Sequence, residues 1–335
     1  MSLSRRTLWT AVASLAALVA VGLIALSLGA ETIAPAKVIA ALAHRIPAAD
    51  QAAIIIWQLR LPRIALALFV GAALALAGAV MQAYFRNPLA DPYILGISSG
   101  AALGAVIALS LNLAAGASFG AVQALAFVGA IAVMAAVFGI TRATGRRDTL
   151  TLLLVGIALG VLLNSVTSFV MSRSTGGLLA NQFFWLMGSL ASAKWQSVWI
   201  LCVVTLVGGA ASLVLSRELD ILLMGDEEAQ HLGVSVGRVR AVAIIAASLL
   251  TSVAVAAAGV VAFIGLIVPH IVRLVIGPSH RALLPIAAVA GAAFLILADL
   301  VARTALAPAE IPIGIVTSLI GAPVFLVVLL RGRRA

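Results

Sequence analysis

Ten apolar runs dominate the chain, and each is long enough to cross a lipid bilayer if tilted and broken helices are allowed. They fall near residues 8–29, 61–83, 93–113, 121–141, 149–171, 197–216, 240–262, 263–277, 282–300 and 311–330, of which 263–277 is the weakest. Only 10% of the residues are charged, whereas soluble domains carry roughly a quarter. The sequence therefore predicts an all-α polytopic integral membrane protein of about ten transmembrane helices, with residues 1–335 forming a single transmembrane domain.

The first run, 8–29, resembles a signal peptide because Arg5 and Arg6 precede it. It is long enough to span a bilayer, and no convincing cleavage signature follows it. We interpret it as a retained first helix.

Lysine and arginine divide unevenly between the two sides of this predicted bundle. With a cytoplasmic N-terminus, fourteen of the 21 basic residues lie inside: Arg5, Arg6, Arg86, Arg142, Arg146, Arg147, Arg217, Arg238, Arg240, Arg273, Arg281, Arg331, Arg333 and Arg334. This is the positive-inside bias expected when both termini are cytoplasmic and the number of spans is even. Topology then explains most of the net charge of +10, so the charge implies no nucleic-acid partner.

A polar segment, residues 225–240, interrupts the apolar sequence on the predicted cytoplasmic side. It holds Asp226, Glu227 and Glu228, three of the 11 acidic residues, followed by Gly233 and Gly237, which are typical of helix ends. This pattern predicts one or two short helices lying on the membrane surface as a docking element for a soluble partner. An ordinary loop between two spans is the alternative.

Several prolines predict irregular backbone at or near membrane depth. They occur in Asn87-Pro88, Asp91-Pro92, Pro269-His270, Gly277-Pro278, Ile311-Pro312 and Ala322-Pro323. Non-helical backbone is tolerated there only where protein or a watery cavity shields it, so these sites are candidate walls of a pathway. For Pro278 and Pro312 we favour simple helix ends.

The sequence lacks the groups that would make the chain an enzyme or a self-energised transporter. The centres of the spans carry no ionisable group, and Asp299, near one end, is expected to pair with Arg303 four residues later. The only lysines, Lys37 and Lys194, lie outside any phosphate-binding loop motif. The histidines, His44, His231, His270 and His280, are scattered, and His270 is expected to start a helix or to pack. We therefore expect no catalytic residue, no metal site and no cofactor in this chain.

The sequence closely resembles the FecCD/BtuC-type permeases of bacterial ABC importers for vitamin B12, ferric siderophores and haem. The resemblance covers essentially the whole length, through the stretches 59–105 (LRLPRIALALFVGAALALAGAVMQAYFRNPLADPYILGISSGAALGA), 183–190 (FFWLMGSL), 225–236 (GDEEAQHLGVSV), 265–285 (GLIVPHIVRLVIGPSHRALLP) and 298–330 (ADLVARTALAPAEIPIGIVTSLIGAPVFLVVLL). It implies a homodimer of ten-helix subunits in the bacterial or archaeal cytoplasmic (inner) membrane, with the pathway at the two-fold axis. Two ATP-binding subunits, which hold the ATP and Mg²⁺, would lie beneath, and a substrate-binding protein above. Besides these, membrane lipid is the only other partner implied.

The resemblance also assigns roles to residues. The family's coupling helices match Asp226, Glu227, Glu228, His231, Leu232, Gly233, Val234 and Gly237. The arginines that receive acidic residues of the binding protein match Arg60, Arg63 and Arg303, and an outer arginine is well explained by a carboxylate partner held in its planar fork. Lipid headgroup anchoring is the alternative for these arginines.

The cytoplasmic gate residues of the vitamin B12 permeases match Asn87, Leu89 and Thr149, although Leu150 replaces the polar residue found beside the last of these. In the span 149–171, Asn164, Ser165, Thr167 and Ser168 could either line a pathway or join helices. The function predicted is the permease subunit of an importer for a metal chelate; an ion-coupled secondary carrier or a membrane scaffold is the alternative. The sequence leaves open which chelate is carried.

Overall fold

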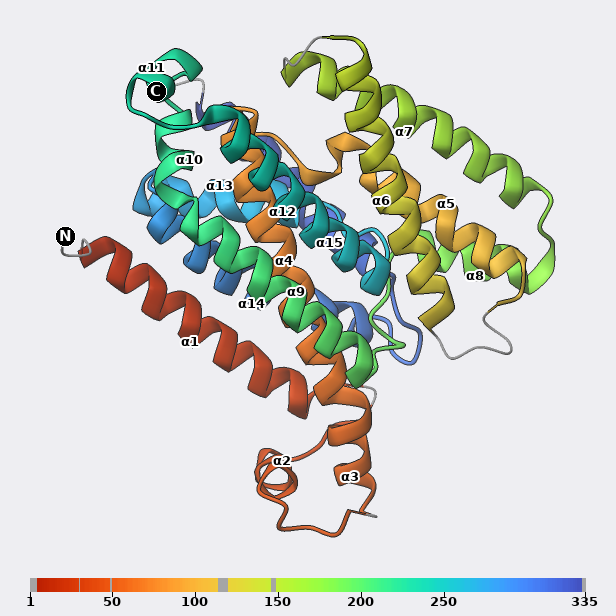
Figure 1. Cartoon of the computed structure of the whole chain (residues 1–335). Coiled ribbons are helices and arrows are strands. Elements are labelled where there is room, and N and C mark those ends of the chain that lie inside the picture. The colour runs from red at the N-terminus through yellow and green to blue at the C-terminus, as the bar shows by residue number, and fades with distance from the viewer. Residues whose placement is uncertain (1–4, 30, 49, 114–119, 146–148, 333–335) are drawn as a thin grey trace.

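The computed structural model describes residues 5–29, 31–48, 50–113, 120–145 and 149–332, and these residues form helices joined by short connections (Figure 1). In chain order the helices are α1 (Arg5–Ser27), α2 (Pro35–Leu42), α3 (Gln51–Ile54), η1 (Ile55–Arg60), α4 (Leu61–Tyr84), η2 (Pro92–Leu95), α5 (Ile97–Ser110), α6 (Gly120–Ala143), α7 (Thr149–Ser172), α8 (Gly176–Leu186), α9 (Trp195–Val214), α10 (Ser216–Leu222), α11 (Asp226–His231), α12 (Val236–Ala258), α13 (Ile264–Ile276), α14 (His280–Thr304) and α15 (Ile313–Gly332). The predicted all-α class is confirmed for the part of the chain that is described.

Helix α4 lies at the centre of the bundle, in contact with α9, α12, α13 and α14 (Figure 1). Of the most apolar stretch of the continuous helix Gln51–Tyr84, 78% is buried, compared with 11% for α1 and 17% for α7. The outer helices instead expose apolar side chains, as a membrane protein must where it meets lipid or another subunit.

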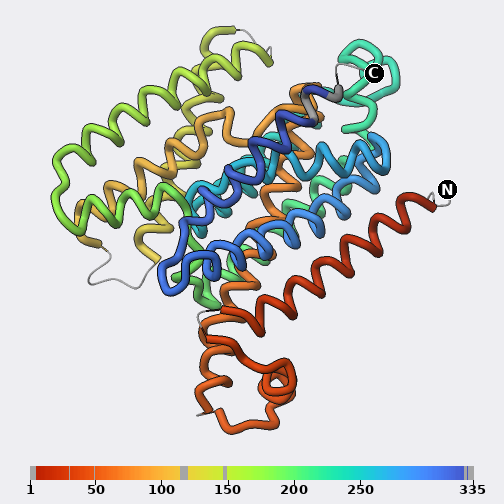
Figure 2. The backbone as a smooth tube through the Cα atoms, turned by 180° about the vertical axis from the view of Figure 1, so that it is seen from behind, coloured from red at the N-terminus to blue at the C-terminus, as the bar shows by residue number. Residues whose placement is uncertain are grey.

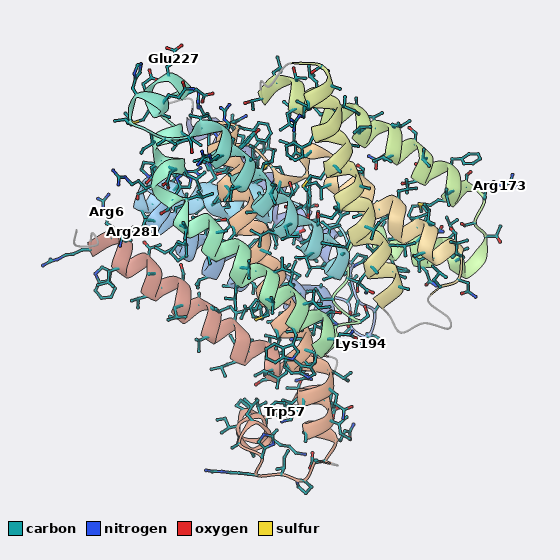
Figure 3. The ribbon with its side chains drawn as sticks, in the orientation of Figure 1. Arg6, Trp57, Arg173, Lys194, Glu227 and Arg281 are labelled. Carbon is teal, nitrogen blue, oxygen red and sulfur yellow. The ribbon has the colours of Figure 1, made fainter. Side chains whose placement is uncertain are left out.

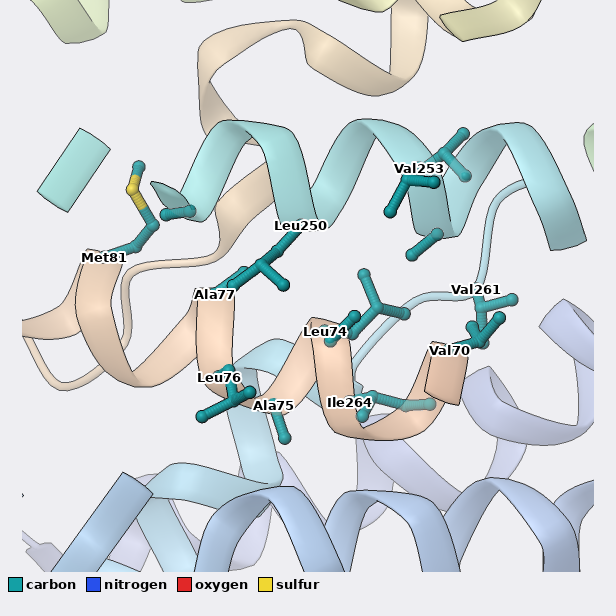
Figure 4. Close-up of a cluster of buried hydrophobic side chains, with 14 of the residues drawn as sticks. Val70, Leu74, Ala75, Leu76, Ala77, Met81, Leu250, Val253, Val261 and Ile264 are labelled. Atoms are coloured by element: carbon teal, nitrogen blue, oxygen red, sulfur yellow. The ribbon is translucent and has the colours of Figure 1, made fainter. Parts of the chain in front are cut away.

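Small residues let the central helices approach closely. A Cβ atom added at Gly71 of α4 would overlap the Gly291 carbonyl of α14, and one added at Gly78 would overlap the Gly265 carbonyl of α13. On another face of α4, Leu74 and Ala77 lie toward Leu250 of α12, and Val70 lies beside Val261, just after α12 (Figure 4). Helices in lipid associate largely through such close packing, because lipid tails are as apolar as the side chains themselves.

Each of the ten predicted spans corresponds to a helix of the structure. Seven described helices are long and apolar enough to cross a membrane, and Ile97–Ser110, Ile264–Ile276 and the stretch Ile313–Val327 are shorter apolar helices. The weak run 263–277 is the short helix α13. Helix α8, and the pair α2 and α3 that follows α1, were not predicted from the sequence.

The prediction of irregular backbone was wrong at Pro269 and Pro323, which lie inside α13 and α15. Of the two roles expected for His270, a helix start or packing, the structure therefore excludes the first. Proline at position 269 leaves the Gly265 carbonyl without its usual helical donor. The buried Gln82 side chain of α4 replaces that donor, because its Nε2 donates to Gly265 O at 3.3 Å and to Leu266 O at 3.0 Å. A helix in lipid can keep an internal proline when a neighbour satisfies the freed carbonyl in this way.

The break that does occur in this region separates α12 from α13. Gly259 and Phe263 both have positive φ, +71° and +70°. The hydroxyl of Tyr93, on η2, donates to Val261 O at 2.9 Å and thereby supports the break from the side. Irregular backbone is thus buried against protein, as expected at membrane depth, but at residues that the prolines did not indicate.

The two ends of the bundle differ in what they carry. The start of α1, the end of α15 and α11 lie at one end, while α2 and α3 project from the other (Figure 2). Figure 3 shows Arg6, Arg281 and Glu227 toward the first end, and Trp57, Arg173 and Lys194 toward the second. An even number of crossings therefore connects the described ends of the chain, as the basic residues predicted.

Candidate functional site

The polar segment forms the short helix α11, which ends in a left-handed turn. The amide of Leu232 donates to Glu228 O at 3.0 Å, Gly233 has φ +80°, and the amide of Val234 donates to Ala229 O at 2.9 Å. These bonds satisfy the last carbonyls of a helix that ends at a left-handed glycine. A Cβ atom at Gly233 would meet nothing within 4 Å, so the backbone conformation, and not crowding, explains the glycine.

The second predicted stop, Gly237, is a different case. It lies in the first turn of α12, which begins at Val236, so no second short helix forms. The sequence predicted one or two short helices in this segment, and the structure has one, α11. Four residues, 232–235, connect α11 directly to a long central helix.

Helix α11 presents acidic and apolar side chains to the surface together. Glu227 and Glu228 are exposed, and the helix is anchored through Ala229, which is fully buried. Met224, just before the helix, is 66% exposed, and Leu232, just after it, is 60% exposed. A cavity of about 410 Å³ lies between α10 and the α11–α12 connection, with Arg217 and Arg238 in its lining. Exposed large apolar residues at the polar end of a membrane protein are typical of a protein-docking surface.

Asp226, the first residue of α11, is bound by two arginines from different helices. Arg86, just after α4, donates through Nη2 to Oδ1, and Arg240 of α12 donates through Nη1 to Oδ2 and through Nη2 to Oδ1, both at 2.9 Å. The Arg240 guanidinium also lies 5.7 Å from the centre of the Tyr84 ring, at the end of α4. We call Arg86, Asp226 and Arg240 the Asp226 cluster; it joins the ends of three helices.

The predicted gate residues lie directly after Arg86. The Asn87 side chain accepts the Leu89 amide at 2.9 Å through Oδ1, which closes a tight turn between α4 and η2. Thr149 begins α7, and α7 packs against η2, the helix that follows this turn. His270, in the middle of α13, is half-buried and interacts with the Pro88 backbone of the same turn.

The three outer arginines are bound within the chain. Arg63 Nε donates to Asp299 Oδ1 at 2.9 Å, and its Nη1 and Nη2 donate to the two Glu310 carboxylate oxygens at 2.9 and 3.0 Å. Arg60 and Arg303, 5% and 7% exposed, donate to backbone carbonyls at the end of α1 and just after it: Arg60 to Leu26 O and Glu31 O, and Arg303 to Ala25 O.

The predicted ion pair of Asp299 and Arg303 is present at 3.6 Å, but Arg63, which was not predicted to pair with Asp299, is the closer partner. Asp299 is 2% exposed and has two arginine partners, so it is not an unpaired ion-binding carboxylate of the kind that a coupled carrier needs. Glu310 is 43% exposed and lines a cavity of about 200 Å³ together with Arg63. Docking of a binding protein on these arginines stays a prediction.

The polar residues of α7 separate into two groups. Asn164, Thr167 and Ser168 line a cavity of about 490 Å³ between α7, α5 and α8. Ser165 is exposed, and its hydroxyl donates to Val161 O of its own helix at 3.0 Å. Asn164 and Ser168 therefore face a cavity, whereas Ser165 lies outside its lining, and a pathway role for these residues stays a prediction.

Two polar links that fix helix positions were not predicted from the sequence. Arg273 of α13 donates to the buried Gln82 Oε1 at 2.6 Å, and Asp220 of α10 accepts the His280 amide at 2.8 Å at the start of α14. Burial raises the pKa of Asp220, but hydrogen bonds from His280 and Ser279 outweigh it and hold that pKa below its usual value. A glutamine in the middle of an apolar run was the only available signal, because each of these partners is more than fifty residues away in sequence.

Comparison with known proteins agrees with this arrangement. The chain is 48% identical to the cobalamin import system permease protein BtuC of Halobacterium salinarum, over 85% of this chain and 75% of that protein. It is 43% identical to the hemin transport system permease protein HmuU of Yersinia pestis, over 83% of this chain and 84% of that protein. It is 39% identical to the vitamin B12 import system permease protein BtuC of Salmonella typhi, over 98% and 97% of the two chains.

A solved structure described as a metal-chelate type ABC transporter in an inward-facing conformation matches with a TM-score of 0.85 and 34% identity. The match covers 96% of this chain and 98% of the other. Residues 17–331 match the FecCD transport family. The chain therefore belongs to the FecCD transport family and is a multi-pass permease subunit of an ATP-binding cassette importer, not an enzyme.

Proposed function

We propose that two copies of this chain form the membrane pathway for a metal chelate: cobalamin, haem or an iron–siderophore complex. The relatives named for cobalamin and haem support this class of substrate. The cavity that contains Asn164 and Ser168 supports it as well, because it offers polar groups between otherwise apolar helices. Both termini are cytoplasmic in this proposal, since the described ends of the chain lie at the same end of the bundle as α11 (Figure 2).

The observation that carries the proposal is the surface of α11. Exposed Met224 and Leu232 flank an acidic helix that is connected by four residues to α12 and, through the Asp226 cluster, to α4. Such a surface supports docking of a soluble ATPase subunit, which would hold the ATP and Mg²⁺. Asn87, Leu89 and Thr149 would form the cytoplasmic gate. The face that contains Arg60, Arg63 and Arg303 would receive the binding protein.

Reconstitution tests this proposal. The permease, its ATPase subunit and its binding protein are assembled in proteoliposomes, and ATP-dependent uptake of labelled cobalamin, haem and a ferric siderophore is measured. We expect uptake of one of these chelates with ATP and none without it. Uptake that follows a proton or sodium gradient in the absence of ATP would contradict the proposal and favour a secondary carrier.

A further inference from the structure

We propose that Arg86 is the positioning residue that passes movement of α11 to the turn formed by Asn87 and Leu89. The inference rests on the proposed function, in which α11 binds the ATPase subunit and this turn belongs to the gate. The inference gives Arg86 a role in transport, whereas topology alone would explain it as one more positive charge on the cytoplasmic side.

The Arg86 guanidinium spans the connection that leads into α11. Its Nε donates to Leu222 O, at the end of α10, at 2.8 Å, and its Nη2 donates to Asp226 at the start of α11. One side chain thus holds both ends of the connection 223–225. Arg240 binds both oxygens of the same carboxylate and shares Oδ1 with Arg86, so Asp226 is fixed between α4 and α12.

The backbone of Arg86 places this guanidinium directly beside the turn. Its amide donates to Ala83 O and the amide of Asn87 donates to Gln82 O, each at 3.1 Å, so Arg86 closes the last turn of α4. Asn87 follows at once and forms the turn with Leu89. No flexible residue separates the arginine from the gate turn, and a displacement of Asp226 is therefore transmitted to the turn.

Arg86 adopts a backbone conformation that is unfavourable for an arginine. Its φ is +48°, a left-handed value that favours glycine, and helices commonly place glycine at this position. A residue held in an unfavourable conformation persists when its surroundings require it, and here the bonds to Leu222 and Asp226 provide that requirement.

The same feature supplies a discriminating variant, Arg86→Gly. Glycine removes the guanidinium but suits the backbone, so the variant should fold at least as well as the wild type. Arg86→Lys is the second variant. It keeps the charge, but a lysine cannot reproduce the planar fork that reaches two acceptors. Arg281→Gln is the matched control, because Arg281 is an exposed arginine at the same end of the bundle (Figure 3).

The complex in proteoliposomes gives three measurements: ATPase assembly by pull-down, substrate transported per ATP hydrolysed, and thiol labelling at Leu89→Cys in a Cys202→Ser background with and without nucleotide. For Arg86→Gly and Arg86→Lys we expect normal assembly, transport per ATP lowered about 2- to 30-fold, the range seen for coupling residues, and loss of the nucleotide-dependent change in labelling. Arg281→Gln should match the wild type in all three.

Each other result has a defined meaning. Wild-type transport per ATP in Arg86→Gly overturns the inference, and so does loss of ATPase assembly, which would make Arg86 part of the docking surface. If Arg86→Gly does not fold, Arg86→Lys tests the inference instead: wild-type transport per ATP, or loss of ATPase assembly, in that variant overturns it. A wild-type complex that does not assemble or transport would instead contradict the proposed function.

Discussion

Single residues act in this protein mainly through backbone conformation and buried charge. Gly233 and Arg86 both adopt left-handed backbone beside α11, one with no neighbour within 4 Å of a Cβ position and the other held by two acceptors. The role of Gly233 as the end of a short helix was predicted from the sequence, because a glycine after a polar helical segment commonly marks a helix C-terminus. The role of Arg86 was not predicted, because only the fold brings Leu222 and Asp226 to its guanidinium.

Substitution at Gly233 tests the turn after α11. We expect Gly233→Val to uncouple transport from ATP hydrolysis, because a β-branched residue at φ +80° costs about 1–3 kcal/mol and would distort the connection to α12. Gly233→Asn is the control, since asparagine tolerates left-handed backbone. Transport per ATP in proteoliposomes measures the effect. Full coupling in the valine variant would show that the connection is an ordinary loop.

Glu310 tests the outer arginines. Its carboxylate occupies two donors of Arg63, so Glu310→Gln should weaken that fork while Asp299 keeps its own partners. If the binding protein places a carboxylate on Arg63, we expect Glu310→Gln to tighten docking, and Arg60→Glu to weaken it by about 1–3 kcal/mol. Calorimetric titration of the reconstituted permease measures both affinities. Affinities that stay the same in both variants would favour headgroup anchoring.

At the scale of helices, hydropathy predicted the ten spans because an apolar run of that length has few alternatives to crossing a membrane. Local signals were less reliable for breaks. Proline at 269 suggested one, but Gln82, distant in sequence, satisfies the carbonyl that this proline frees. The break at Gly259 and Phe263 depends on contacts with η2, which the sequence alone does not place.

Gln82 offers a test of how α4 and α13 are joined. Gln82→Leu should lower the thermal stability of the detergent-solubilised protein, because it leaves the Gly265 carbonyl of α13 and a guanidinium donor of Arg273 without partners, at about 1–3 kcal/mol for each group. Adding Pro269→Ala should recover part of the loss, since alanine restores an amide for the Gly265 carbonyl. A double variant no more stable than Gln82→Leu alone would rule out this account of the internal proline.

At the scale of the whole molecule, burial and charge have separate directions. Burial decreases from α4 outward to α1 and α7. Charged residues instead lie at the two ends of the bundle: Arg6, Arg281 and Glu227 toward the end with α11, and Arg173 and Lys194 toward the other (Figure 3). The first pattern indicates that the outer apolar faces meet lipid or a second copy of the chain. The second agrees with charged residues lying at the two membrane surfaces, and the positive-inside rule predicts that the end with α11 is the cytoplasmic one.

Topology is therefore testable with single cysteines, since Cys202 is the only native one and Cys202→Ser removes it. We expect cysteines at Glu227 and Arg281 to react with an impermeant thiol reagent only from the cytoplasmic side, and cysteines at Arg173 and Lys194 only from the outside. The sequence also predicts cytoplasmic labelling for positions near Arg146 and Arg334, which lie outside the described residues. Labelling of Arg281→Cys and Lys194→Cys from the same side would contradict their predicted placement on opposite sides of the membrane. Labelling of Glu227→Cys from outside would reverse the orientation and would separate α11 from any cytoplasmic ATPase.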